Sequence, residues 1–172
     1  MARTYYSSAL DHTADQVWEV VRRFDRHGWS GIETRVEGAM LGDEIGAIRY
    51  LRLGAKEISE RLLAHSNVNR SYTYERCDPT VPTRNYRATI RVYPIVETAK
   101  AFVEWWAEFD DVSGDHGQPI GESLNLRFAK SLISLRSFMA SRNAERVLSA
   151  TAQDRQLDGN AHRAERPMLR LV

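Results

Sequence analysis

Apolar and polar residues alternate along two stretches of the chain with the period of two that a β-strand imposes on its side chains. In residues 86–93 the alternating set includes Tyr86 and Ala88, and in residues 102–110 it includes Trp105. Shorter stretches of strand character come earlier, separated by turn signals. They cover residues 4–9, 32–37, 47–53, 57–65 and 70–76. The chain is therefore expected to form seven strands.

Two other stretches have the three- and four-residue spacing of apolar positions that is typical of an amphipathic helix. The first follows Thr13 or Asp11, either of which could cap it, and carries Val17, Trp18, Val20, Val21 and Phe24. The second carries Leu124, Phe128, Leu132, Leu135 and Met139, with no helix breaker before Gly159. Residues 153–166 are polar and are expected to form a tail of low order.

The predicted order is a strand, a helix, six strands and a long helix. This order is typical of an α+β domain, in which an antiparallel sheet carries its helices toward one side. A curved sheet around one long helix leaves an internal cavity, where a ligand would lie. We expect a domain over residues 1–142 and a C-terminal extension over residues 143–172.

Composition and charge narrow the class of protein. Among the 172 residues 42% are hydrophobic and 27% charged, which is enough to bury one core. The net charge of +1 gives no indication of a nucleic-acid partner or of binding to an anionic membrane. No apolar run reaches the length of a signal peptide core or of a membrane span, so membrane insertion is not expected. One cysteine and five scattered histidines predict no disulfide and no metal site, and no nucleotide-cofactor motif occurs. We expect a cytoplasmic protein without cofactors, which could form a homodimer.

Glu60 is the first candidate for chemistry. It shares an otherwise apolar strand face with Ile58, Leu62 and Ala64, while His65 lies on the opposite face. Burial of an unpaired carboxyl raises its pKa toward values useful for acid–base catalysis. The alternative is a structural glutamate that is paired with an arginine or with a tyrosine hydroxyl.

Tyrosines form the second group of candidates. Tyr86 begins an alternating face, and its phenol could donate to a ligand carbonyl or enolate, or simply pack at the end of the sheet. Tyr72 and Tyr74 share a face and would add two phenols, although one of them is expected to be core packing. Trp105 is expected to pack in the core, with a cavity wall as the alternative. Arg49 shares a strand face with Leu51 and Leu53, which are expected to face inward, and it could meet an anionic group of a ligand there. We nevertheless expect Arg49 to be a surface arginine.

Six segments together resemble the START-like (SRPBCC) superfamily, which includes the polyketide cyclase/dehydrase and lipid-transport family and the plant abscisic-acid receptors. They lie in order at residues 17–25, 46–49, 60–62, 70–72, 85–89 and 105–110. The resemblance implies a helix-grip fold, with a seven-stranded sheet around a C-terminal helix and a cavity for an apolar or polyketide-like ligand.

The resemblance also implies roles for individual residues. Glu60 and Tyr86 match ligand-side positions of the receptors, and Leu51, Leu53 and Tyr74 match cavity positions. Leu124, Phe128 and Leu132 match the cavity face of the last helix, and Ile58, Tyr72, Ala88 and Trp105 complete the expected ligand-binding set. The receptors' gate loop is shortened here to residues 53–55, and their latch is replaced by residues 81–83, so hormone signalling is not expected.

Three functions follow as hypotheses. In the first, the cavity catalyses a cyclisation or dehydration, with Glu60 as acid or base and with Tyr86 and Tyr74 holding a carbonyl or enolate. In the second, the protein carries or senses a lipid or aromatic ligand without reaction, which a salt-bridged Glu60 would favour. In the third, residues 153–172 recruit a partner.

Overall fold

The computed structural model describes residues 1–36, 42–78, 83–111 and 118–164. The chain divides into two compact units, Met1–Arg136 and Ser137–Val172. The first unit holds the sheet, the first helix and the start of the last helix. Among the described residues, no helix is both long and apolar enough to cross a membrane. The predicted domain boundary after residue 142 stays a prediction.

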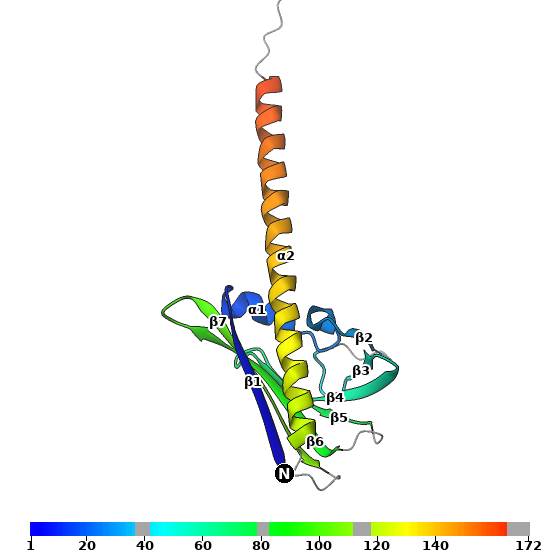
Figure 1. Cartoon of the computed structure of the whole chain (residues 1–172). Helices are drawn as coiled ribbons and strands as arrows, with labels where there is room; N and C mark the ends of the chain where they lie inside the picture. The colour runs from blue at the N-terminus through cyan, green and yellow to red at the C-terminus, as the bar shows by residue number, and fades with distance from the viewer. Residues whose placement is uncertain (37–41, 79–82, 112–117, 165–172) are drawn as a thin grey trace, which may run out of the picture. The chain divides into compact units, whose positions relative to one another are not determined.

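The strands of the first unit form one antiparallel sheet of seven, in the order β1-β7-β6-β5-β4-β3-β2 (Figure 1). From β2 to β7 each strand pairs with the next, and β1 joins the sheet beside β7. The strands are β1 (Ala2–Leu10), β2 (Glu33–Val36), β3 (Ile48–Leu53), β4 (Lys56–Ser66), β5 (Ser71–Arg76), β6 (Thr83–Ile95) and β7 (Lys100–Asp111). The α+β class and the curved helix-grip architecture are confirmed.

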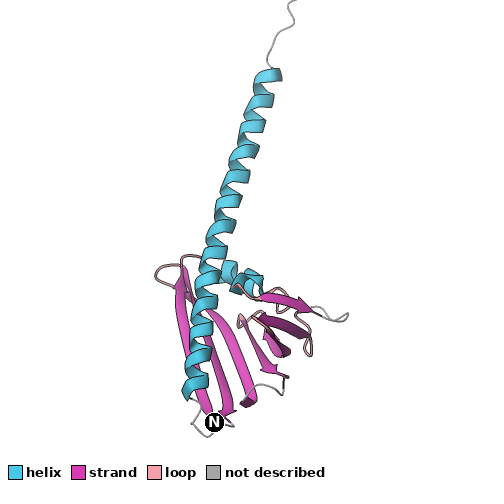
Figure 2. Ribbon diagram, turned by 45° about the vertical axis from the view of Figure 1, so that its right-hand side comes forward, coloured by secondary structure: helices cyan, strands magenta, loops and turns pink. Residues whose placement is uncertain are grey.

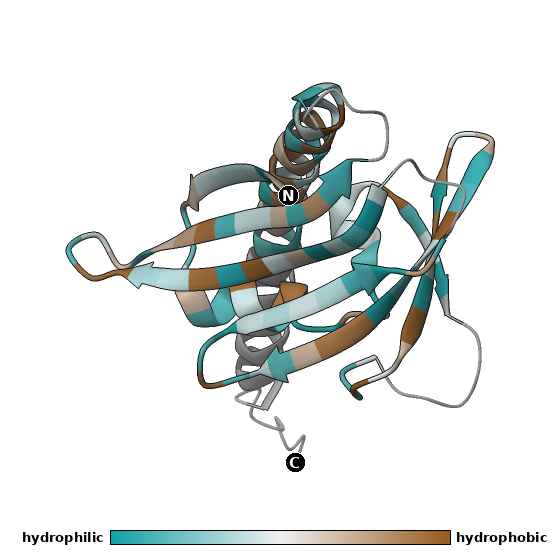
Figure 3. Ribbon diagram, turned by 90° about the horizontal axis from the view of Figure 1, so that it is seen from below, coloured by the Kyte–Doolittle hydropathy of each residue, from teal (hydrophilic) through white to brown (hydrophobic). Residues whose placement is uncertain are grey.

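Hydrophobic and hydrophilic residues alternate along the strands, as the colours of Figure 3 show. One face of the sheet is therefore buried. Two of its strands supply Tyr86, Ala88, Ile90 and Val92 from β6 and Ala101, Val103, Trp105, Ala107 and Phe109 from β7. The inward positions predicted for these two strands are the buried ones.

The end of β4 departs from this alternation. The register with β5 shifts between Leu62 and Ala64, as a β-bulge does. Ala64 is therefore exposed, whereas the His65 ring stacks on Tyr72 and its Nε2 donates to the Arg22 carbonyl at 3.0 Å. The prediction that Ala64 faces inward and His65 outward is wrong, because a bulge reverses the parity beyond it.

Two helices cover the buried face of the sheet. Helix α1 (Ala14–Val21) begins at Thr13, whose hydroxyl accepts from the Gln16 amide while the Gln16 side chain accepts from the Thr13 amide. Trp18 of α1 packs on Tyr72, and Phe128 of helix α2 stacks on Trp105 with 4.5 Å between ring centroids. Since Tyr72 and Trp105 are on the same face, both helices lie on that side (Figure 2).

Helix α2 (Gln118–Ala164) is longer than expected. Residues 153–164 belong to it, so the prediction of a low-order tail is wrong for them. Alanine, glutamine, arginine and leucine dominate that stretch and favour helix, and one Gly159 costs only about 1 kcal/mol. The predicted tail beyond residue 164 lies outside the described residues.

Candidate functional site

A buried ion pair joins two neighbouring strands under the helices. Arg49 of β3 and Glu60 of β4 are direct cross-strand partners. The Nε and Nη2 atoms of Arg49 donate to Glu60 Oε2 at 2.9 and 2.7 Å. Arg49 is 0% exposed and Glu60 3% exposed. The expectation of a surface Arg49 is wrong, and the structural alternative for Glu60, a carboxylate paired with an arginine, is what the structure shows.

The rest of the Arg49 guanidinium is also satisfied. Its Nη1 donates to the Phe24 carbonyl at 3.2 Å and to His27 Nδ1 at 3.1 Å. Its plane lies over the rings of Phe24 and Tyr74. Burial lowers the pKa of Arg49, but the Glu60 carboxylate, together with Tyr72 and Tyr74, more than offsets this, so the pKa lies above its usual range. The Arg49 guanidinium is therefore charged.

His27 adds a neutral imidazole to this network. It lies in the short 3₁₀ turn η1 (His27–Ser30) and packs against the rings of Trp29 and Trp105. Burial first, and then the Arg49 charge, hold the pKa of His27 well below its usual range. Because a guanidinium only donates, Nδ1 accepts and the proton is on Nε2.

Three phenols lie next to the ion pair. Burial raises the pKa of Tyr72, raises that of Tyr74 well above its usual value, and raises that of Tyr86 to about 12. All three are therefore protonated at neutral pH. The Tyr74 oxygen accepts from Trp105 Nε1 at 3.0 Å, while the Tyr72 hydroxyl has no well-formed hydrogen bond within the described part of the chain.

A pocket of about 620 Å³ lies among the β3–β4 turn, the end of β5 and the first turns of α2. Its apolar lining is Leu53, Ile58, Pro119, Ile120 and Leu124. Its polar lining is Lys56, Glu57, Arg76, Asp78, Ser123 and Arg127. This volume is within the range of small-molecule sites, and the mixture of walls fits an amphipathic ligand.

A family model described as polyketide cyclase / dehydrase and lipid transport matches residues 1–138. The chain belongs to this family. The resemblance predicted from the six segments is thereby confirmed. The comparison with curated proteins gives no match.

Several solved structures have the same fold as this chain. A protein from Thermobifida fusca is 27% identical, with a TM-score of 0.72 over 82% of this chain and 95% of that chain. An uncharacterized protein from Bacillus thuringiensis is 24% identical, with a TM-score of 0.70 over 81% and 99%. Norcoclaurine synthase from Thalictrum flavum is 14% identical, with a TM-score of 0.64 over 81% and 86%. These similarities concern the fold.

The structure divides the predicted ligand-binding set in two. Leu53, Ile58 and Leu124 line the 620 Å³ pocket. The others are packed in the core and do not line this pocket: Leu51, Tyr72, Tyr74, Ala88, Trp105, Phe128 and Leu132, with Glu60 among them. For these residues, contact with a ligand stays a prediction.

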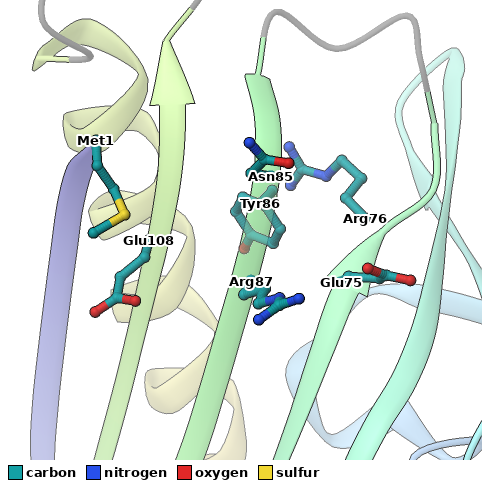
Figure 4. Close-up of a pocket in the computed structure, with 7 residues that line it drawn as sticks. All are labelled: Met1, Glu75, Arg76, Asn85, Tyr86, Arg87 and Glu108. Carbon is teal, nitrogen blue, oxygen red and sulfur yellow. The ribbon is translucent and has the colours of Figure 1, made fainter.

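Tyr86 lies at a second, more polar pocket of about 470 Å³ (Figure 4). The pairing of β6 with β7 shifts between Arg84 and Arg87, and Asn85 takes a left-handed φ of 52°. Tyr86 keeps the inward parity of Ala88 at this bulge, and Arg76 lies over its ring at 4.2 Å. Since Arg76 lines both pockets, it lies between the phenol and the larger pocket.

Sequence reasoning missed two polar residues of this region. Arg76 follows Tyr72 and Tyr74 at alternating positions, so strand parity could have found it. Arg127 adjoins the apolar helix face, so no comparable signal existed for it. Within the described residues no cluster of three metal-ligating side chains occurs.

The segment that corresponds to the receptors' gate loop is the turn between β3 and β4. Gly54 in this turn adopts a φ of 64°, which a tight two-residue turn requires. In the segment that corresponds to the latch, residues 81 and 82 lie outside the described residues.

Proposed function

We propose that the protein binds a small, largely apolar molecule, of polyketide-like, aromatic or lipid type, in the 620 Å³ pocket. The observation that carries this proposal is the pocket itself, with Leu53, Ile58 and Leu124 forming an apolar wall where the sequence predicted ligand contacts. Membership in a family of cyclases, dehydrases and lipid-transport proteins supports it.

Binding without reaction is the form that the buried network favours. One oxygen of Glu60 accepts two hydrogen bonds from Arg49. The Arg49 guanidinium therefore already balances the charge of this carboxylate. A general base must reach the proton that it removes. Glu60 does not line the pocket, and a carrier or sensor role therefore needs fewer assumptions than catalysis by this residue.

Filling the pocket should weaken binding. We expect Ser123→Trp to weaken binding of the neutral fluorophore N-phenyl-1-naphthylamine at least tenfold, because Ser123 is an exposed residue of the pocket lining. Leu126→Trp adds the same side chain three residues further along α2, at a position that is 56% exposed and does not line the pocket. A fluorescence titration measures both. Equal affinities of the two variants would contradict the proposed site.

Catalysis of a cyclisation or dehydration is the second candidate, and the Tyr86 phenol favours it. With a pKa of about 12 this phenol keeps its proton and could donate to a carbonyl or enolate. Norcoclaurine synthase, which shares the fold, is described in complex with dopamine and hydroxybenzaldehyde. Native mass spectrometry would identify a copurified ligand. Tyr86→Phe should then lower its conversion at least tenfold, and unchanged conversion would remove Tyr86 from the mechanism.

The cytoplasmic location, the homodimer and the recruitment of a partner by the C-terminal residues stay predictions from the sequence. They are independent of the proposed binding function.

A further inference from the structure

Two arginine side chains reach the same pocket, and neither has a carboxylate partner among the described residues. Arg76, at the end of β5, and Arg127, on α2, both line the 620 Å³ pocket. Within the part of the chain that the structure describes, neither forms an ion pair, and Arg76 Nε is buried without a hydrogen-bond acceptor. Other arginines of the sheet, such as Arg35, Arg49 and Arg61, have carboxylate partners.

The acids of the pocket do not neutralise these two cations. The Glu57 carboxylate receives two hydrogen bonds from Arg35, at 3.1 and 2.9 Å. Asp78 also has an interaction of its own. Lys56 adds a third cation to the lining. The cations Lys56, Arg76 and Arg127 therefore outnumber the acids Glu57 and Asp78 in the lining of the pocket.

Both arginines line the same pocket, and Arg76 lies over the Tyr86 ring at 4.2 Å. The charges of both also lower the pKa of Tyr86, against the larger effect of burial that raises it. A guanidinium beside apolar walls binds an anion more strongly than one in water, because the charge is less screened. At the other walls, Leu53, Ile58 and Leu124 offer only apolar surface.

We infer that the ligand is an amphipathic carboxylate, whose head is held by Arg76 and Arg127 and whose apolar body lies along Leu53, Ile58 and Leu124. This inference rests on the proposed function and names the class of ligand for the same pocket. Two guanidinium groups suit a carboxylate because their planar donors match its two oxygens.

A matched pair of ligands tests the head group. Dodecanoate and 1-dodecanol, below their aggregation limits at pH 7.5, each compete with N-phenyl-1-naphthylamine for the pocket. We expect dodecanoate to displace the probe at a concentration at least tenfold lower than dodecanol. Arg127→Gln should reduce this preference to about threefold, and the double variant Arg76→Gln/Arg127→Gln should abolish it. High salt should weaken it in the wild type.

The control variant is Arg142→Gln, which removes the same charge from α2 at an exposed residue outside the pocket lining. It should keep the full preference for dodecanoate. Equal displacement by both ligands in the wild type, or an unchanged preference in the double variant, would overturn the inference while leaving the proposed function intact. Failure of the wild type to bind the neutral probe would instead contradict the proposed function.

Discussion

Replacing Arg49 with methionine is expected to lower the free energy of unfolding by about 3–5 kcal/mol, because the substitution leaves the Glu60 carboxylate buried without its partner. The side chain of Arg49 is fully buried, and that of Glu60 is 4% exposed. The variant also removes the donor to the Phe24 carbonyl. Chemical denaturation followed by tryptophan fluorescence measures the loss.

A second ion pair of the sheet provides the matched control. Arg61 and Glu75 also face each other across neighbouring strands, at 3.2 Å, but their side chains are 46% and 30% exposed. Arg61→Met should therefore cost less than about 1 kcal/mol. The double variant Arg49→Met/Glu60→Leu should recover much of the loss, because no buried charge remains. A loss below 1 kcal/mol in Arg49→Met would show that the pair contributes little to stability.

This result decides how Glu60 variants are interpreted. If the Arg49–Glu60 pair stabilises the fold, Glu60→Gln leaves a buried guanidinium partly unpaired, and reduced binding or turnover in that variant could reflect unfolding. A catalytic role for Glu60 would require lost conversion at an unchanged free energy of unfolding. Variants of the pocket, such as Ser123→Trp, avoid this ambiguity because Ser123 is exposed.

The sheet could be predicted from the sequence because its signals are local. Alternation predicted the strands to within a few residues, as in β7, expected over residues 102–110 and observed at Lys100–Asp111. Even the Arg49–Glu60 pair has a local origin. The pairing of Leu53 with Lys56 around a two-residue turn fixes the register, and four residues further from the turn it sets Arg49 opposite Glu60.

Other features depend on contacts that a single sequence does not display. The bulge after Leu62 reverses the orientation of Ala64 and His65, and strict parity could not anticipate it. His27 is buried because η1 lies against Trp105, a residue far away in the sequence. Polarity alone does not separate a solvated helix from a tail of low order, and residues 153–164 are helical because most of them favour helix.

Stability should fall as the pH drops from 7 to 5, because of His27. Its pKa is held well below 6.5 in the folded protein by burial and by Arg49, whereas the unfolded chain has the ordinary value. Above pH 6.5 both states are neutral at this residue. Below pH 6.5 the unfolded state binds a proton at His27 that the folded state does not bind. The free energy of unfolding therefore falls by about 1.4 kcal/mol per pH unit until the pH reaches the pKa of His27 in the folded protein.

The variant His27→Gln should flatten this dependence, since its amide oxygen can still accept from Arg49 but carries no titratable proton. Carboxylates with a lowered pKa, such as Asp25 and Glu57, lose their contribution to the free energy of unfolding only at more acidic pH. They therefore do not affect the slope between pH 7 and pH 5. His12→Gln, at a partly exposed residue, is the control and should keep the wild-type slope. Urea denaturation at four pH values measures all three proteins. An equal slope in His27→Gln and the wild type would mean that His27 takes up its proton over the same pH interval in the folded and unfolded states, which would contradict a lowered pKa of His27 in the folded protein.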